Sequence, residues 1–538
     1  MEAIRMSSPQ SPAFELTDPI SRVTSRVSRV SLDTNPKAAN EVDPEALKLN
    51  LEAAKDKGLS PSTTTAVIDN AERDDPFEVR WDGPDDPHCP LNMSTARKWA
   101  IVMVIAVSCL CVTCCSSMAA MTYKGMITSF GINTTLCISS ISFFVMGLGC
   151  GPLLLGPVSE FMGRKPVLHG GFALFFLFNF PVAFAPHIGV HLAFRFVTGF
   201  VGSAFLSVSG GAITDVFHNT HVATPMMIFS SAPFLGPVLG PLLSGFINQR
   251  QPDWRWTYYV VIMWAFVCMV ALLILLPETY DPQLLKRKAK HLRKTDNRWR
   301  APIEKFDRSF TAALKHSLRT PFRLLATEPM VLFLDLWSAL ILGILYLSFS
   351  GVPYIFRTQH GFSLEQTGMS FLGIGAGQVA AALSQPLFNR AYAKVSAAHG
   401  GHAPPEARLV MGMAGGVICP VGLLLLGLTA FKDVHWIVPI ILSSLFGLGL
   451  VYAYTATFTY LVDAYRPVAA SALASNSFLR STFAAGFPLF GLPLYQRLGA
   501  VGATCLLAGL LFLFTPVPFV LYRIGARVRA KSSFTAHS

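Results

Sequence analysis

The sequence has 538 residues, of which 52% are hydrophobic and 14% are charged, and its formal net charge is +12. Soluble globular proteins carry about 25% charged residues, so the composition excludes an ordinary soluble protein and favours one that lies in a lipid bilayer. The positive charge would also suit a nucleic-acid-binding protein, but the basic residues lie between apolar segments rather than in one patch with stacking aromatic residues. No nucleic-acid partner is therefore expected.

Residues 1–97 are polar, rich in Ser, Thr, Asp and Pro, and lack a sustained apolar pattern. We expect them to form a cytoplasmic tail that is largely disordered. Within it, Thr24–Ser31 alternates hydroxyl residues with arginines, which suits phosphorylation, although a merely solvated tail is an equal alternative. The pattern of a cleavable signal peptide is missing, so the first apolar segment is predicted to be an uncleaved insertion signal.

Apolar segments of the length that a hydrocarbon core of about 30 Å requires, about 20 residues, follow one another along the rest of the chain. The segments are long and do not alternate, which favours helices over a β-barrel. We predict an all-α integral membrane protein with twelve transmembrane helices at 99–119, 137–157, 166–186, 189–211, 222–248, 256–276, 330–351, 367–389, 409–430, 435–460, 468–493 and 500–523.

These helices fall into two groups of six, at 98–277 and 330–523, separated by a basic loop at 278–329 and followed by a tail at 524–538. Residues 278–330 contain thirteen Lys and Arg against six Asp and Glu. By the positive-inside rule this loop and both termini face the cytoplasm. Two such halves are a recurrent transporter plan, with the binding site where the halves meet near the bilayer midplane.

The predicted external loop between the first two spans contains the acceptor sequence Asn133-Thr134-Thr135. We therefore expect glycosylation at Asn133.

No metal site, cofactor or enzyme active site is expected from the sequence. Nine of the ten cysteines lie in or beside apolar spans, where small residues pack helices, and Cys111 and Cys114 form a C-x-x-C pair without a second pair. Two histidine pairs have helix-like spacing, but we place them in loops without further ligands: His187 with His191, and His218 with His221. We find no set of nucleophile, base and orienting group.

The loop after the second span contains Gly156, Glu160, Gly163, Arg164 and Lys165. Glycines permit a tight approach of the backbone, and an acid with two bases four or five residues away can form switchable ion pairs at a helix end. On this pattern alone the loop is either a functional site of this kind or an ordinary positive-inside loop.

Arg195 lies in the fourth span, where a guanidinium is costly and is expected to face the bundle interior or a cavity. If the span begins earlier, Arg195 would instead extend to the interface. The fifth span contains Gly236, Pro237, Gly240 and Pro241. Small residues four apart let helices pack closely, and prolines remove backbone hydrogen bonds and bend the helix.

Together the loop, the arginine and the Gly-Pro pairs resemble motifs of the major facilitator superfamily. Further segments resemble its fungal twelve-span drug:proton antiporters: Asp75–Phe77, Trp81–Pro87, Leu276–Pro282, Pro405–Leu409 and Phe478–Arg480. The resemblance implies the major facilitator fold, a gating role for the loop, a part in proton transfer for Arg195 and an antiporter role for the fifth span. Glu160 stands where many members have Asp.

The first span has no acid for proton coupling, so we expect a charge elsewhere to take this part: Arg195, Asp335, Asp215 or Asp463. The acids lie near predicted cytoplasmic ends, and simple interfacial anchors are the alternative. For a substrate cavity the candidates are aromatic residues, which give broad contacts to amphipathic ligands and cation–π contacts to cationic ones: Tyr346, Tyr452, Tyr454 and Phe458.

These observations predict a secondary transporter, coupled to protons, that exports small amphipathic compounds such as drugs, toxins or secondary metabolites by alternating access. A polyamine or nutrient transporter of the same fold and a non-transporting receptor are the alternatives. We expect a monomer whose partners are a small-molecule substrate, protons and the bilayer. The plasma membrane is the expected location, with the vacuolar membrane as the alternative, and no residue pattern names the substrate.

Overall fold

The computed structural model describes residues 77–83, 86–218, 221–305, 310–400, 403–532 and 534, without the side chains of 305–313. The stretch Thr24–Ser31 lies outside the described residues. The chain divides into two compact units, Met1–Glu78 and Val79–Ser538, and the second unit contains the whole helical bundle. Every regular element of the described part is a helix.

The first six long helices are mostly apolar and are joined by short connections. They are α4 (Thr95–Met118), α6 (Thr134–Met162), α7 (Arg164–Ala183), α8 (Ile188–Gly202) with its continuations α9 (Ala204–Ser207) and α10 (Ser209–Thr214), α11 (Ala223–Arg250) and α12 (Arg255–Leu275). Short helices η1 (Pro90–Asn92), η2 (Ala119–Met121) and α5 (Tyr123–Phe130) lie before and after α4.

The second six follow the same plan. They are α16 (Pro329–His360), α17 (Leu364–Ser370) with α18 (Leu372–Ala398), α19 (Leu409–Leu428), α20 (Ile437–Ala464), the two limbs of α21 (Ala469–Phe514), and α22 (Pro516–Arg529), which continues the second limb. The turns η3 (Pro405–Arg408) and η4 (Arg466–Val468) connect them.

Eleven segments are long and apolar enough to cross a membrane, and the last of them, Arg466–Arg529, has 64 residues. At 1.5 Å per residue that segment is about three times as long as a bilayer is thick. It is broken at Gly499, whose φ of 71° reverses the chain, so it crosses twice. The prediction of an all-α membrane protein with twelve transmembrane helices is confirmed.

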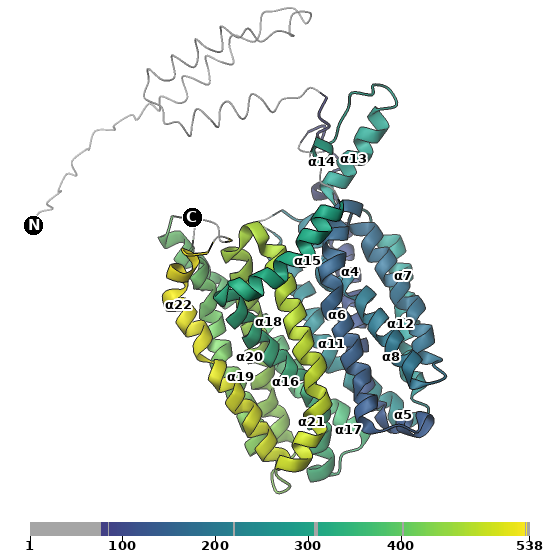
Figure 1. Ribbon diagram of the computed structural model, residues 1–538, viewed down its shortest axis with the longest axis vertical. Helices are drawn as coiled ribbons and strands as arrows, with labels where there is room; N and C mark the ends of the chain where they lie inside the picture. Colours follow the sequence, from purple (N-terminus) through teal and green to yellow (C-terminus); the bar gives the residue numbers. More distant parts are fainter. Residues whose placement is uncertain are drawn as a thin grey trace, which may run out of the picture. The chain divides into compact units, whose positions relative to one another are not determined.

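The connection between α12 and α16 carries three helices, α13 (Asp281–Leu292), α14 (Pro302–Lys305) and α15 (Phe310–Thr327). Figure 1 shows α15 lying across the ends of the long helices, and it packs against α6, α16 and α21. We call this end of the bundle the basic face and the other end the opposite face.

The segment just before α4 is ordered against α13. The indole of Trp81 donates a hydrogen bond to Asp281 at 2.8 Å, and Lys288 forms an ion pair with Asp82 at 2.7 Å. Val79 packs in a small apolar cluster with Leu285. Residues 79–83 and 86–92 therefore contribute to a folded unit on the basic face.

The two groups of six helices meet at the centre and at the opposite face. At the centre α6 packs against α21, and the hydroxyls of Ser116 and Tyr346 lie 2.9 Å apart. At the opposite face the backbone N–H of Leu364 donates to Gln249 at 3.1 Å, and an added Cβ on Gly368 would lie 2.6 Å from the carbonyl oxygen of Pro241. This conformation is therefore closed toward the opposite face.

Candidate functional site

The predicted gating loop sits at the basic face, where Arg164 is held by three groups from different connections. Its Nε donates to Asp215 at 3.3 Å, its Nη1 donates to the Ser159 hydroxyl at 2.8 Å, and the guanidinium lies 4.6 Å from the ring centroid of Tyr280. Gly211 lies so close that a Cβ there would be 2.8 Å from the guanidinium. Arg164 thus joins the starts of α7 and α13 to the end of α10.

Glu278 binds the first turn of α7 through its carboxylate. Its Oε1 accepts hydrogen bonds from the backbone N–H groups of Arg164 at 2.9 Å and Tyr280 at 3.1 Å, because the free N–H groups at a helix start favour an anion. Gly163 has φ of 95°, and a Cβ there would lie 2.5 Å from the carboxylate oxygen. Only glycine meets both requirements.

Two residues of the predicted loop, Glu160 and Gly156, make none of the expected contacts in this conformation. Glu160 is exposed on α6 and makes no ion pair in the described part of the chain, because Arg164 turns inward toward Asp215. A Cβ on Gly156 would meet no atom within 4 Å, so the tight approach is made at Gly163 instead. Lys165 is partly buried, and its backbone N–H lies 3.5 Å from Glu278.

The Asp215 carboxyl is the perturbed acid of this cluster. Burial raises the pKa of Asp215 to about 6, against the opposing effect of the Arg164 guanidinium. Since the ion pair needs the charged carboxylate, it is present above about pH 6 and is lost as the pH falls through that value.

Arg195 is completely buried in α8 and faces the bundle interior, so the alternative of a side chain reaching the interface is excluded. It donates to three backbone carbonyls, those of Ser140 at 3.0 Å, Cys115 at 3.0 Å and Ser116 at 3.2 Å. The last carbonyls of α4 are available because η2 replaces the α-helical turn, and the C-terminal end of a helix attracts a cation.

The guanidinium of Arg195 also lies 4.3 Å from the ring centroid of Phe144. A guanidinium does not lose its proton in proteins. Arg195 can therefore act on coupling only through its charge and its bonds, and not as a link in a proton relay.

His191 is a buried helical residue, so its predicted place in a loop is wrong. Its Nδ1 lies 3.0 Å from the carbonyl oxygen of Val182, and its Nε2 lies 2.9 Å from the Ser140 hydroxyl. A carbonyl oxygen only accepts, so Nδ1 carries the proton and Nε2 accepts from the hydroxyl. Among the described residues no cluster of three His, Cys, Asp or Glu side chains could hold a metal.

Gly236 and Gly240 lie where α11 packs against α4. A Cβ on Gly236 would lie 2.5 Å from that of Thr113, and one on Gly240 would lie 2.7 Å from the carbonyl oxygen of Cys114. Pro237 and Pro241 are accommodated inside one continuous helix. The glycines therefore allow the two helices to approach closely, as small residues do in membranes.

Asp463 lies at the basic face, where it accepts a hydrogen bond from Arg408 at 2.9 Å. The Arg408 guanidinium lies 3.6 Å from the ring centroid of Tyr392. This position matches the alternative of an interfacial anchor.

Asp335 is completely buried in α16 and is bound by two neutral donors of α21. Its Oδ2 accepts from the Ser475 hydroxyl at 3.0 Å, and its Oδ1 accepts from the Asn476 amide at 2.9 Å. The same amide donates to Ser338 at 2.7 Å, and the carbonyl oxygen of Ser338 accepts from the Tyr454 hydroxyl at 2.6 Å. One polar network therefore links α16, α20 and α21.

Three of the four predicted cavity residues lie together around a cation. The Arg480 guanidinium of α21 lies 5.2 Å from the ring centroid of Phe458 and 5.8 Å from that of Tyr454, and Tyr346 is close enough to interact with it electrostatically. Tyr452 lies apart from them, between α18 and α20, where its hydroxyl is 2.6 Å from that of Ser384.

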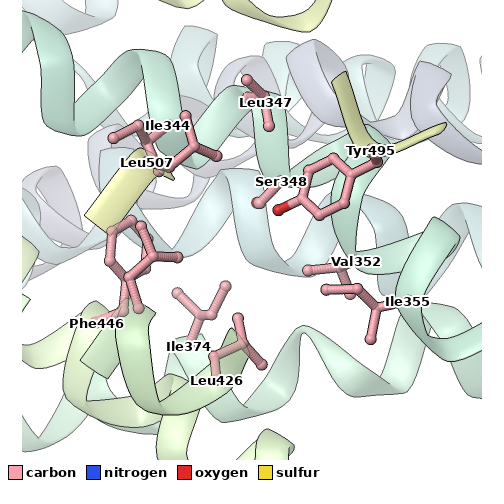
Figure 2. A pocket seen from close by; sticks show the side chains of 11 residues that line it. Ile344, Leu347, Ser348, Val352, Ile355, Ile374, Leu426, Phe446, Tyr495 and Leu507 are labelled. Atoms are coloured by element: carbon pink, nitrogen blue, oxygen red, sulfur yellow. The ribbon is translucent and has the colours of Figure 1, made fainter. Parts of the chain in front are cut away.

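A separate pocket lies among the second six helices. Figure 2 shows it lined by apolar side chains such as Ile344, Ile374 and Phe446, with Tyr495 and Ser348 as its polar groups. Because it contains no charged side chain and no residue of the first six helices, it cannot serve as the meeting point of the halves.

The sequence profile of the Major Facilitator Superfamily matches residues 105–488. The chain belongs to the major facilitator superfamily. An efflux pump of this kind, atB of Aspergillus terreus, is 40% identical over 466 residues, which cover 85% of this chain and 90% of the relative. A probable drug/proton antiporter, YHK8 of Saccharomyces cerevisiae, is 35% identical over 494 residues, which cover 91% of this chain and 94% of the relative.

Solved structures of the superfamily have the same fold. The crystal structure of the human organic anion transporter MFSD10 superimposes with a TM-score of 0.55 at 16% identity, covering 78% of this chain and 99% of that chain. The E. coli xylose transporter XylE, in a partially occluded inward open conformation, has a TM-score of 0.55 at 15% identity, covering 78% of this chain and 98% of that chain. The profile match and the relatives confirm the predicted family and the multi-pass membrane location, and the family is one of transporters.

No site role was predicted from the sequence for Ser338, Ser475 and Asn476 of the polar network, nor for Arg480. A signal was present, because a charged residue inside the predicted span 468–493 is a functional candidate by itself. Nothing in the sequence shows that Ser475 and Asn476 reach Asp335, since that contact joins residues about 140 positions apart.

Proposed function

We propose that the protein is a proton-coupled efflux transporter for small amphipathic organic compounds that works by alternating access as a monomer. The observation that carries the proposal is the completely buried carboxyl group of Asp335, bound by α21 beside a cluster of aromatic rings at the centre of the bundle. The relatives, an efflux pump and a probable drug/proton antiporter, support the direction of transport and the coupling ion.

In this proposal each predicted group has a defined part. Asp335 binds the coupled proton, since an acid inside the membrane is costly unless it has such a function. Arg195 holds the end of α4 near Ser116 and thereby positions Tyr346, with which Ser116 is hydrogen-bonded. The cluster of Arg164, Asp215 and Glu278 orders the basic face, which we take to be cytoplasmic.

Substrate release requires the contacts at the opposite face to open while those at the basic face close. The glycines of α11 permit its close packing on α4 and so keep the first six helices together as one moving body. The predicted halves, 98–277 and 330–523, are the two bodies of this motion, with 278–329 as their cytoplasmic connection. We place the protein in the plasma membrane.

The test uses purified protein in proteoliposomes loaded with fluorescent amphipathic dyes, ethidium as a cation and Nile red as an uncharged compound. An imposed pH gradient is expected to drive uphill transport of at least one dye, and a protonophore is expected to abolish it. Asp335→Asn removes the proton-binding group and is expected to stop uphill transport, whereas Asp433→Asn, an exposed acid at the opposite face, is the matched control. If the rate of wild-type dye transport does not depend on the pH gradient, the proposal is wrong.

A further inference from the structure

Arg480 is a partly buried cation within a membrane-spanning helix, and in the described part of the chain no counter-ion contacts it directly. In the described part of the chain it makes no ion pair, and its Nε is buried without a hydrogen-bond partner. The rings of Phe458 and Tyr454 are what its guanidinium lies against. A guanidinium held this way inside a bundle is costly unless another partner is available to it.

That second partner is Asp335. Asn476, which binds the Asp335 carboxylate, precedes Arg480 by four residues on α21, and residues four apart lie on one face of a helix about 5–6 Å from each other. Asp335 is already close enough to interact electrostatically with the guanidinium. Rotation of the long Arg480 side chain toward Asn476 is therefore the movement that would exchange the rings for the carboxylate.

Among the residues that the structure describes, no acid other than Asp335 interacts electrostatically with Arg480. The titratable groups facing the pair are the hydroxyls of Tyr346, Tyr454 and Tyr465. Tyr465 is engaged by Glu328 at 2.9 Å. The basic residues of the neighbouring helix α15, namely Lys315, Arg319 and Arg323, are exposed.

The rings against which Arg480 lies are at the junction of the two groups of helices. Phe234 of α11 lies 5.3 Å from Tyr454, ring centroid to ring centroid, and Tyr346 is hydrogen-bonded to Ser116 of α4. Aromatic faces at such a junction attract a flat cation. In this structure the protein's own guanidinium takes that place.

We propose that Arg480 is an internal competitor of the substrate: it lies on the aromatic faces when Asp335 is protonated, and a planar organic cation that takes those faces displaces it onto the deprotonated Asp335. The proposal rests on the proposed function and supplies its coupling. When the guanidinium pairs with the carboxylate, the Asp335 proton leaves to the cytosol. When Asp335 regains a proton from outside, Arg480 returns to the rings and expels the ligand.

The charge balance fits an exchange of one proton for one monovalent cation. With the ligand bound, the ligand and Arg480 are positive and Asp335 is negative. With the proton bound, Arg480 is positive and Asp335 is neutral. The site holds one net positive charge in both states, so the exchange of ethidium for a proton moves no net charge across the membrane.

The test measures ethidium binding to the purified full-length protein by fluorescence anisotropy across a pH series. In wild type, the Kd for ethidium is expected to rise tenfold for each unit by which the pH is lowered below the value at which Asp335 becomes protonated, because one proton competes with one ligand. Arg480→Gln removes the competitor and is expected to bind ethidium tightly with no such slope. Arg497→Gln, an exposed arginine on the same helix α21, is the matched control and is expected to behave as wild type.

Two further measurements keep the proposal falsifiable if Arg480→Gln does not fold. Arg480→Lys keeps the charge but lacks the planar guanidinium, so it is expected to retain the pH slope with tighter ethidium binding than wild type. In wild-type proteoliposomes, a potassium potential set with valinomycin is expected to leave the rate of ethidium–proton exchange unchanged.

An unchanged slope in Arg480→Gln would overturn the proposal, since ligand and proton would then compete without the arginine. Tighter binding of pyrenecarboxylate than of ethidium, lost in Arg480→Gln, would also overturn it and would make Arg480 an anion site. If the pH gradient drives efflux while either result is found, only this proposal fails. If the gradient drives no efflux, the proposed function itself fails.

Discussion

Gly149→Ala is expected to destabilise the conformation seen here, because Gly149 of α6 lies directly against α21. An added Cβ would clash with the Cβ of Ser481, and it would lie 3.0 Å from the Ser481 hydroxyl and 3.5 Å from the carbonyl oxygen of Ser477. Carbon atoms normally approach to about 3.5–4.0 Å, so the two helices must separate by roughly 1 Å at the centre of the bundle.

Overpacking of this kind costs about 1–3 kcal/mol. If the cost falls on this conformation and not on one in which α6 and α21 are apart, the equilibrium between them shifts about 5-fold to 150-fold. Gly486→Ala on α21 is the matched control, because an added Cβ there meets no atom within 4 Å. Ser481→Gly removes the opposing side chain and is expected to restore the equilibrium in Gly149→Ala.

The assay is the distance between spin labels at the opposite face, on Arg250 of α11 and Thr358 of α16, both exposed. The partly exposed native cysteines are first replaced by serine: Cys89, Cys150 and Cys505. Gly149→Ala is expected to move the distance distribution to longer values, as the closed face opens. An unchanged distribution in Gly149→Ala, or an equal change in Gly486→Ala, would refute the reasoning.

Arg195→Ala and Arg195→Lys are both expected to reach the membrane and to lose uphill dye transport. Lysine is expected to rescue transport poorly, because its ammonium group cannot donate to three carbonyls as the planar guanidinium does. Full transport by the alanine variant would remove Arg195 from the mechanism. Gly236→Leu is expected to impair transport by separating α11 from α4, whereas Gly170→Leu is the control, because an added Cβ there meets no atom within 4 Å. Thermal denaturation of both variants shows whether lost helix packing causes the transport defect. Asn133 is exposed and caps α6 through its side-chain oxygen, so a glycan on its nitrogen is compatible with the fold, and a glycosidase shift that persists in Asn133→Gln would contradict glycosylation there. The pKa of Asp215 is raised from 3.8 to about 6, so between these values the folded state holds a proton that the unfolded state releases. The free energy of unfolding is therefore expected to fall by on the order of 3 kcal/mol as the pH rises from about 4 to 6. A wild-type melting temperature with the same pH dependence as that of Asp215→Asn would contradict this.

Much of the fold is determined locally and could be predicted from the sequence. A span such as 166–186 needs only its own apolar length to be recognised, since in lipid every backbone hydrogen bond must be made within the segment. Gly499 marks the turn that divides the 64-residue segment into two crossings. The gating motif and the Gly-Pro motif are also contiguous, so they could be found as patterns before their contacts were known.

The contacts of the candidate site depend on long-range packing and could not be read from the sequence. Glu160 and Arg164 are four residues apart, yet Arg164 binds Asp215, 51 positions away, because the chain turns at Gly163 and the two side chains point in different directions. Asp335 is one acid among several near predicted helix ends, and only the approach of α21 gives it two donors and a nearby cation.

The sequence alone therefore determined the membrane location, the number of spans and the family, because each depends on composition, length and contiguous motifs. Only the tertiary structure decided which charges are paired. Arg195 is stabilised by the carbonyl groups at the end of α4, and Asp463 is paired with Arg408. Arg480 has no direct charged partner in the described part of the chain. The physical reason is that in a low-dielectric bundle the state of a charge depends on the few atoms within hydrogen-bond distance, and those atoms come from other helices.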